Sequence, residues 1–192
     1  MQHALKEWAV AVDALIRGEM IVVLRKGGIR EEGGSFKVPH RQVWLYPTYE
    51  HQRPDLLKAG YADSVTPVEP GWHPETVSIQ AWADITHVVQ IFNAETVEAL
   101  LPMHIWTEEF VWERLKWKPK SPLYLLLLRV YRLSMPQTIS YHSSYGGCRS
   151  WITLNEPITV SEFDPVLSDA DYEDKVRAIH QITEAIGERV RD

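Results

Sequence analysis

Basic residues and two glycines come together in RKGGIRE, residues 25–31 of this 192-residue sequence. The glycines are Gly27 and Gly28, and Arg25, Lys26 and Arg30 supply positive charge. Successive glycines let backbone N–H groups converge on an anion. The spacing is neither that of a P-loop nor that of a dinucleotide fingerprint, so the stretch indicates anion binding without a nucleotide class. A tight turn with exposed basic residues is the alternative interpretation.

Aromatic and basic side chains are interleaved in IWTEEFVWERLKWKPK, residues 105–120, which includes the pair Trp117 and Lys118. Aromatic faces beside cations can stack nucleic-acid bases while the cations hold phosphates. Trp44 and Tyr46, two residues apart, would offer a second aromatic face from one strand. Core packing is the alternative for all of these rings, because tryptophan is usually at least partly buried.

Acid–base chemistry is a third option, and it would use Glu32 with His40 or His51. Histidine titrates near neutral pH, and a nearby carboxylate can orient it. Such a pair would make the protein a hydrolase or a nuclease-like enzyme. Solvated turn carboxylates and hydrogen-bonded histidines are the alternative. The eight histidines form no H-x-x-x-H pair and no cluster with cysteine, so we expect no metal and no cofactor.

The charge distribution leaves room for local basic surfaces. The formal net charge is −6, and residues 156–192 account for all of it, with ten acidic and four basic side chains. Bases outnumber acids in the segments 17–58 and 104–155, although without the strong excess that marks many nucleic-acid binders. The sequence does not decide whether these two segments share a face.

A cytoplasmic protein is expected. The longest apolar run falls far short of the ~20 residues of a membrane span, and the N-terminus lacks the basic region of a secretory signal. The single cysteine, Cys148, excludes an internal disulfide. We therefore expect no membrane association.

Helices are predicted from apolar spacing and from capping residues. Apolar residues recur at helical spacing near the N-terminus, namely Leu5, Trp8, Ala9, Val12, Leu15 and Ile16. Gly18 follows as a natural helix end. Asn93 and Thr107 are of the types that cap helix N-termini. The predicted helices cover residues 5–16, 51–60, 94–101, 108–117 and about 168–191. The last of these is acidic and keeps one apolar stripe, formed by Val176, Ile179, Thr183, Ile186 and Val190.

Strands are predicted where β-branched residues gather or where apolar and polar residues alternate. The segment 41–48 alternates, which places Val43 and Leu45 on the face opposite Trp44 and Tyr46. The segment 123–133 hardly alternates, which is typical of a central strand covered on both faces. The predicted strands cover residues 19–25, 35–38, 41–48, 76–92, 123–133 and 151–154.

Together these elements predict an α+β fold with a central mixed or curved, barrel-like sheet, flanked by helices at both chain ends. We expect one domain over residues 1–192, with its core in about 5–160 and an acidic C-terminal helix at about 168–191.

Four blocks, KEWAVAVDAL, LRKGGIREE, FKVPHRQVWLYPTYEHQ and IWTEEFVWERLKWKPKSPLYLLLLRVYRL, resemble the bacterial domain-of-unknown-function family 1802 over nearly the whole chain. The family blocks fall on Arg25, Lys26, Gly27, Gly28, Glu32, Trp44, Pro47, Thr48, His51 and Gln52. The resemblance implies a link to restriction or DNA handling, since such domains occur joined to Mrr-like nuclease domains. It carries over no catalytic residue, because the family has no established activity.

Our leading hypothesis is a non-catalytic nucleic-acid recognition or accessory module, similar to small curved-sheet domains of the PUA type. Its candidate ligand-binding residues are Arg25, Lys26, Gly27, Gly28, Arg30, Glu32, His40, Trp44, Tyr46, Thr48, His51, Trp117 and Lys118. The Glu/His enzyme is the alternative. A third hypothesis is a protein-interaction subunit, in which the acidic C-terminal helix meets a basic partner or a second copy of the chain.

Overall fold

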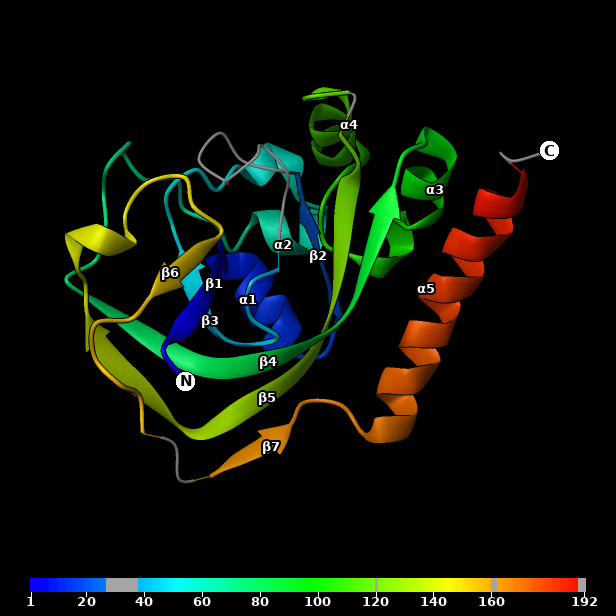
Figure 1. Ribbon diagram of the computed structural model, residues 1–192. Coiled ribbons are helices and arrows are strands. Elements are labelled where there is room, and N and C mark those ends of the chain that lie inside the picture. Colours follow the sequence, from blue (N-terminus) through cyan, green and yellow to red (C-terminus); the bar gives the residue numbers. More distant parts are fainter. Residues whose placement is uncertain (27–37, 120, 160–161, 190–192) are drawn as a thin grey trace.

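The computed structural model describes residues 1–26, 38–119, 121–159 and 162–189 (Figure 1). Five α-helices and seven strands occur in this part of the chain. The strands are β1 (His3–Trp8), β2 (Val22–Arg25), β3 (Gln42–Thr48), β4 (Thr76–Ile91), β5 (Leu123–Ser140), β6 (Trp151–Thr153) and β7 (Phe163–Pro165). The α-helices are α1 (Ala9–Ile16), α2 (Ala59–Ala62), α3 (Ala94–Ala99), α4 (Glu108–Lys116) and α5 (Asp169–Arg189). The 3-10 helices are η2 (Pro54–Leu56), η3 (Leu101–Met103) and η4 (Ser143–Tyr145).

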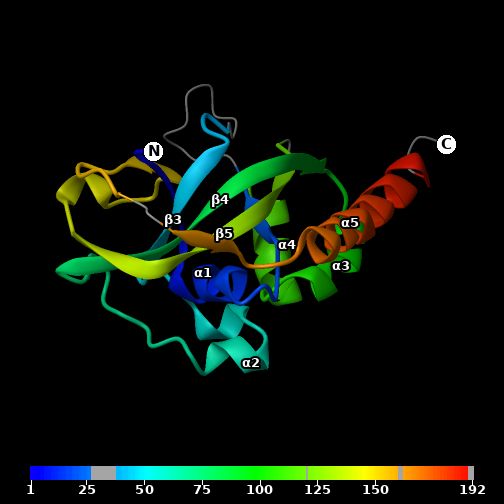
Figure 2. The same ribbon diagram turned by 90° about the horizontal axis from the view of Figure 1, so that it is seen from below.

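The seven strands form one sheet in the order β2-β5-β4-β3-β1-β6, with β7 paired to β5. β1 and β3 are parallel, and the other pairs are antiparallel. The long strands β4 and β5 bend strongly, and their register shifts between Ile79 and Ala81 and again between Ile85 and His87 (Figures 1 and 2). Such irregularities increase the local twist, so the sheet curls into a half-barrel. The predicted α+β class with a curved mixed sheet is confirmed.

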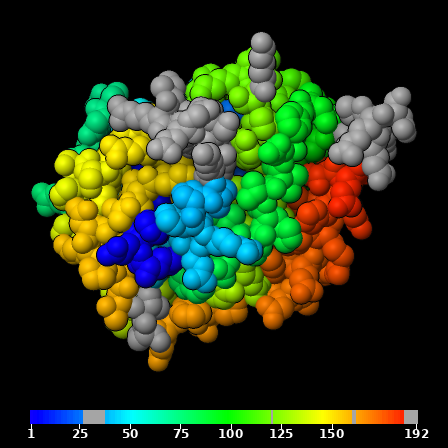
Figure 3. All heavy atoms as spheres, viewed as in Figure 1, coloured from blue at the N-terminus to red at the C-terminus, as the bar shows by residue number. Residues whose placement is uncertain are grey.

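The two faces of β3 lie in two different hydrophobic cores, as its alternation predicts. Val43 and Leu45 belong to the larger core, which the helices cover. Trp44 and Tyr46 belong to a second core with residues such as Ile79. Figure 2 shows α1 and α2 together on one side of the sheet. Figure 3 shows the N-terminal residues, the β3 region and residues near β6 side by side on one surface.

The predicted opening helix is wrong in its first half. Residues 3–8 form strand β1, and the helix begins only at Ala9. Ala4 and Leu5 are fully buried and lie between β3 and β6, with Ala4 in the second core and Leu5 in the first. Pairing on both sides outweighs the helical spacing of the sequence. Gly18 does end this segment, with the positive φ of 71° that favours glycine.

The capped helices are confirmed. The Asn93 side chain accepts a hydrogen bond from the Thr96 amide, and the Thr107 side chain accepts one from the Phe110 amide. The Ser168 hydroxyl accepts one from the Asp171 amide at the start of α5. The helix predicted for residues 51–60 is instead divided into η2 and α2, and Gly60 lies inside α2 rather than at a helix end.

Strand predictions around β2 and β5 are confirmed, and β5 runs on to Ser140. Of the segment predicted at 76–92, residues 76–91 form the single strand β4. The return strand predicted at 35–38 falls almost wholly outside the described residues. No helix in the described part of the chain combines the length and the apolar character that crossing a bilayer requires.

Helix α5 packs along the molecule through Tyr172, Val176, Ile179 and Ile182 (Figure 1). Val176 and Ile179 were expected on this stripe, whereas the side chains of Ile186 and Val190 lie outside the described part. The Arg129 guanidinium fixes the start of α5 by donating to the Ser168 carbonyl at 3.0 Å and to the Asp169 carboxylate at 2.7 Å. The acidic helix, which the sequence suggested as a contact for a partner, therefore uses part of its apolar stripe to pack against its own chain.

Candidate functional site

A buried ion pair joins the two sides of the curled sheet. The Arg25 guanidinium donates through Nη1 to Glu7 Oε2 at 2.7 Å, and through Nη2 to the Lys6 carbonyl. The Glu7 side chain is 6% exposed and that of Arg25 is 12% exposed. β1 and β2 are not neighbours in the sheet, so Arg25 closes the half-barrel rather than lying free for a ligand.

The turn from β1 into α1 is held by side chains around Glu7. Glu7 Oε1 accepts from the Trp8 amide at 2.7 Å, and Gln52 Oε1 accepts from the Val10 amide at 3.0 Å. The Thr48 hydroxyl donates to the Glu7 carbonyl at 3.0 Å. Because these side chains satisfy backbone groups at the helix start, Thr48 has a structural role here.

Lys26 ties the end of β2 to the last turn of α4. Its Nζ donates to the Leu115 carbonyl at 3.1 Å, and the residue is only 8% exposed. Burial lowers the pKa of Lys26. This contact links the segment 17–58 to the segment 104–155, so the two basic segments meet at the C-terminal end of α4 (Figure 1).

Arg114, the residue before Leu115, is partly buried. Its guanidinium carbon is 3.4 Å from the centroid of the Phe110 ring, one helical turn earlier. Burial lowers the pKa of Arg114 to about 10, the Glu7 carboxylate acts in the opposite direction, and the Arg25 charge lowers this pKa further. Within the described residues, the Arg114 guanidinium makes no hydrogen bond and no ion pair.

Two tryptophan–lysine pairs lie at the end of α4. Trp117 is 43% exposed, and the Lys118 Nζ lies 4.8 Å from the centroid of its ring. The Lys116 Nζ lies 5.6 Å from the Trp112 ring. We call these four residues the α4-end surface. It combines exposed aromatic area with positive charge.

Trp44 and Tyr46 are not on that surface. They are 2% and 3% exposed, so their rings are core rather than a stacking platform. Trp44 Nε1 donates to the Met1 carbonyl at 3.1 Å. The Tyr46 hydroxyl is buried without a hydrogen-bond partner among the described residues. Burial is the main cause that raises the pKa of Tyr46, and Tyr141 and Tyr145 add to it.

His40 and His51 lie at opposite ends of β3, about 20 Å apart for a strand of this length. The His40 ring stacks on His3 with centroids 3.4 Å apart, and burial together with His3 lowers the pKa of His40. His51 is exposed, with Nε2 3.4 Å from Glu50 Oε1. The structure therefore does not bring the two histidines together.

Four candidate residues, Gly27, Gly28, Arg30 and Glu32, lie outside the described residues, so the predicted Glu/His pair remains a prediction. Across the described residues, no group of three or more His, Cys, Asp or Glu side chains is arranged to hold a metal ion.

Sequence reasoning missed Glu7 and Arg114. A signal existed for each of them. Glu7 is an acidic residue directly before the apolar run of α1, and Arg114 is four residues after Phe110, where helical residues meet. Neither signal shows that Glu7 pairs with Arg25, because that contact depends on how the sheet curls.

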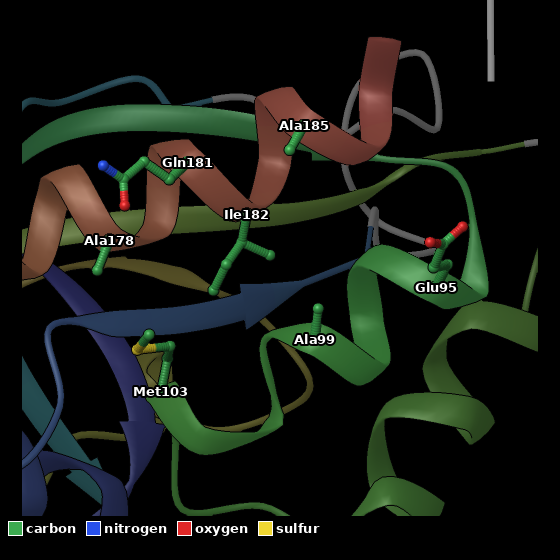
Figure 4. A pocket seen from close by; sticks show the side chains of 7 residues that line it. All are labelled: Glu95, Ala99, Met103, Ala178, Gln181, Ile182 and Ala185. Carbon is green, nitrogen blue, oxygen red and sulfur yellow. The ribbon is translucent and has the colours of Figure 1, made fainter. Parts of the chain in front are cut away.

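A groove of about 510 Å³ lies elsewhere, between α5 and the α3–η3 segment. Figure 4 shows Ala178 and Ile182 of α5 facing Ala99 and Met103. The described residues that line it are Glu95, Ala99, Met103, Ala178, Gln181, Ile182 and Ala185. None of these described lining residues belongs to the α4-end surface.

Similar solved structures have low sequence identity to this chain. The ASCH protein from Zymomonas mobilis is 14% identical, with 92% of this chain and 93% of that chain covered and a TM-score of 0.46. Two single-residue mutants of the same protein are each 13% identical, with TM-scores of 0.45 and 0.44. The comparisons with these mutants cover 92% and 91% of this chain, and 94% and 96% of theirs.

No curated protein matches this chain. A family model does match, over residues 4–178, and it includes β1 from its second residue, the Glu7–Arg25 pair, all of α4 and the first half of α5. The chain thus belongs to the family described as a domain of unknown function, DUF1802.

Proposed function

We propose that this protein is a non-catalytic nucleic-acid recognition module that binds through the α4-end surface. The observation that carries the proposal is the hydrogen bond from Lys26 to the Leu115 carbonyl, because it sets the end of β2 beside Trp117 and Lys118. A role in restriction or DNA handling in the cytoplasm is part of this proposal.

The chemistry of this surface favours single strands. An exposed indole stacks an unpaired base, and a lysine beside it reaches the neighbouring phosphate. Trp117 and Lys118, directly after α4, form such a pair, and the partly buried Trp112 lies near Lys116 within the helix. Bases in a duplex already stack on each other, so we expect weaker binding to double strands.

A salt titration tests the proposal. Fluorescence anisotropy with labelled single-stranded and duplex DNA and RNA should give log affinities that fall linearly with log salt, because phosphate contacts release counterions. Trp117→Ala should weaken single-strand binding by about 1–3 kcal/mol, the value of one base–aromatic stack.

Trp72→Ala is the matched control. Trp72 is 46% exposed, against 43% for Trp117, and lies in the loop before β4, against Tyr49. Its loss should leave binding unchanged. Absence of binding to all four nucleic acids at low salt, or equal losses in both tryptophan variants, would reject the proposal.

The groove between α3 and α5 supports a second candidate function, the binding of a basic amphipathic helix from a protein partner. Its walls are mainly apolar, through Ala99, Met103 and Ile182. The exposed acidic residues Glu98 and Glu184 adjoin lining residues on the two helices. An apolar groove with acidic flanks suits a helix with an apolar stripe and flanking Lys or Arg.

Substitution of a small groove residue tests this second function. Ala178→Trp would fill the groove, so binding of a labelled Leu/Lys amphipathic peptide should be lost while the fold is kept. Ala170→Trp, at an exposed position near the start of the same helix, is the control. Sedimentation at several protein concentrations separates peptide binding from pairing of two copies. If the peptide binds both variants equally, the groove is not its site.

A further inference from the structure

Two histidines face each other where α5 packs against β4. The ring centroids of His87 and His180 are 5.0 Å apart, and the rings meet edge to face at 74°. Both side chains are partly buried, and that of His180 is 34% exposed. Two imidazole rings at this distance repel each other when both are charged. The contact between strand and helix therefore depends on their protonation.

The attachment of α5 is firm at its first turn and sparse beyond it. Arg129 holds the start of the helix, and the Tyr172 and Thr86 hydroxyl oxygens lie 2.5 Å apart. Among the α5 side chains whose burial the structure describes, only Tyr172 and Ile179 are buried. A segment with few buried contacts opens more easily than the core of the same protein. The His180 contact lies in this sparsely buried part of α5.

The neighbours of His87 disfavour its charged form. Its Nδ1 lies 2.9 Å from Thr86 Oγ1, which is uncharged. Burial is the main cause that lowers the pKa of His87, and the charges of His180 and Arg41 act in the same direction. Within the described residues, no carboxylate offsets these effects on His87.

The charged neighbours on α5 are placed differently. The His180 Nδ1 lies 3.8 Å from Glu184 Oε1, so this carboxylate favours a charged His180. At the start of the helix, Asp169 pairs with Arg129. His180 is thus the imidazole that tolerates a proton, and His87 is the one that resists it while α5 is in place.

We propose that His87 and His180 form a pH-sensitive latch, which keeps α5 packed against β4 while His87 is neutral and releases the helix in mild acid. Release is local, because the strands β4 and β5 stay paired when the helix leaves. A released α5 removes both the His180 charge and part of the burial from His87. The proton on His87 is then no longer opposed.

The direction of the pH effect follows from linkage. Because packing of α5 lowers the pKa of His87, packing is fully favoured above pH 6.5 and weakens as the pH falls through the lowered value. Uptake of one proton limits the change in the opening equilibrium to about tenfold per pH unit.

The inference rests on the second candidate function only in what release does to the groove. Ala178 and Ile182 line the groove and flank His180 in the sequence of α5. Release of α5 moves this wall relative to Ala99 and Met103 on the other side (Figure 4). A helix bound in the groove is therefore expected to dissociate in mild acid. The latch itself needs no ligand.

Hydrogen exchange tests the latch on the protein alone. Between about pH 7.5 and about pH 5.5, amide protection over 176–185 of α5, corrected for intrinsic exchange rates, should fall, while amides 125–128 of β5 stay protected. His87→Asn should abolish this fall, and His180→Asn should reduce it. His73→Asn is the control, because His73 is exposed and stacks on Tyr141, and it should respond as the wild type does.

Three results would overturn the latch. They are wild-type α5 protection that does not change with pH, a His87→Asn protein that keeps the wild-type change, and an equal loss of protection in β5, which indicates global unfolding. His104→Asn separates the latch from the acid sensitivity of the core. It removes a different buried histidine, so the α5 response should remain.

Peptide binding at the two pH values separates the latch from the groove. The Leu/Lys peptide does not titrate in this interval, so a change in its affinity reports on the protein. Binding that is lost in acid by the wild type and kept by His87→Asn supports regulation of the groove. Equal binding at both pH values overturns that regulation. A peptide that binds at neither pH rejects the groove function and leaves the exchange result as the test of the latch.

Discussion

Arg25 and Glu7 are 2.7 Å apart, although their strands lie near opposite ends of the sheet order. The curl of β4 and β5 brings β2 back toward β1, and the ion pair closes this approach. Because Glu7 also accepts from the Trp8 amide, the same carboxylate fixes where β1 ends and α1 begins.

Glu7→Ala should be strongly destabilising. The change removes one partner of a buried ion pair and leaves the Arg25 guanidinium buried without its carboxylate, which typically costs about 3–5 kcal/mol of unfolding free energy. It also removes the acceptor of the Trp8 amide. Urea unfolding followed by circular dichroism measures the difference from the wild-type free energy.

Glu19→Ala is the control for this prediction. Glu19 pairs with Arg17 at 2.8 Å, but the two side chains are 37% and 50% exposed. Loss of an exposed pair should cost no more than about 1 kcal/mol. Similar losses in both variants would show that the Glu7–Arg25 pair has no special role in closing the sheet.

The opening residues show which part of the fold the sequence can predict. Leu5 and Trp8 fit helical spacing with the residues that follow, so the local pattern favours one helix from Leu5. Whether residues 3–8 pair as a strand depends on β3 and β6, which are distant in sequence. Local signals such as the Asn93 and Thr107 caps, by contrast, need no distant partner and were predicted correctly.

Lys118→Gln should lower the salt dependence of nucleic-acid binding. Removal of one phosphate contact reduces the slope of log affinity against log salt by about 1 and weakens binding similarly for all base sequences. The measurement is the anisotropy titration repeated over a range of salt. Lys175→Gln on α5 should leave the slope unchanged, and a slope that falls equally in both variants would assign the effect to net charge.

The candidate site was predictable only in part. Interleaved tryptophan and lysine pointed to Trp117 and Lys118, because that signal lies within one segment. The alternation of β3 correctly separated Trp44 and Tyr46 from Val43 and Leu45. It could not show that a second core covers the Trp44 face, since residues from β4, β5 and β6 supply that core.

Tyr46→Phe should be neutral or stabilising. The Tyr46 hydroxyl is buried and unpartnered within the described residues, and such a group costs about 1–3 kcal/mol that phenylalanine would recover in part. Tyr145→Phe is the matched control, because Tyr145 is equally buried but its hydroxyl accepts from the Asn155 amide at 2.8 Å. That variant should lose about 1 kcal/mol. Unfolding free energies in urea separate the two, and a destabilised Tyr46→Phe would mean that its hydroxyl has a partner.

His104 should make the stability of the fold depend on pH. His104 is 4% exposed, and Lys58 donates to its carbonyl at 2.6 Å. Burial lowers the pKa of His104 from 6.5 to about 4, and the Lys58 charge acts in the same direction. The unfolded chain therefore binds a proton below pH 6.5 that the folded chain does not bind until about pH 4.

The sign of the effect follows from this difference. Stability contributed by neutral His104 is fully present above pH 6.5 and is lost as the pH falls toward 4, by on the order of 3 kcal/mol over the whole interval. Urea unfolding at a series of pH values should show this decline in the wild type and a shallower one in His104→Asn. His73→Asn, at an exposed histidine stacked on Tyr141, should decline as the wild type does. A His104→Asn protein with the wild-type slope would place the acid-sensitive group elsewhere.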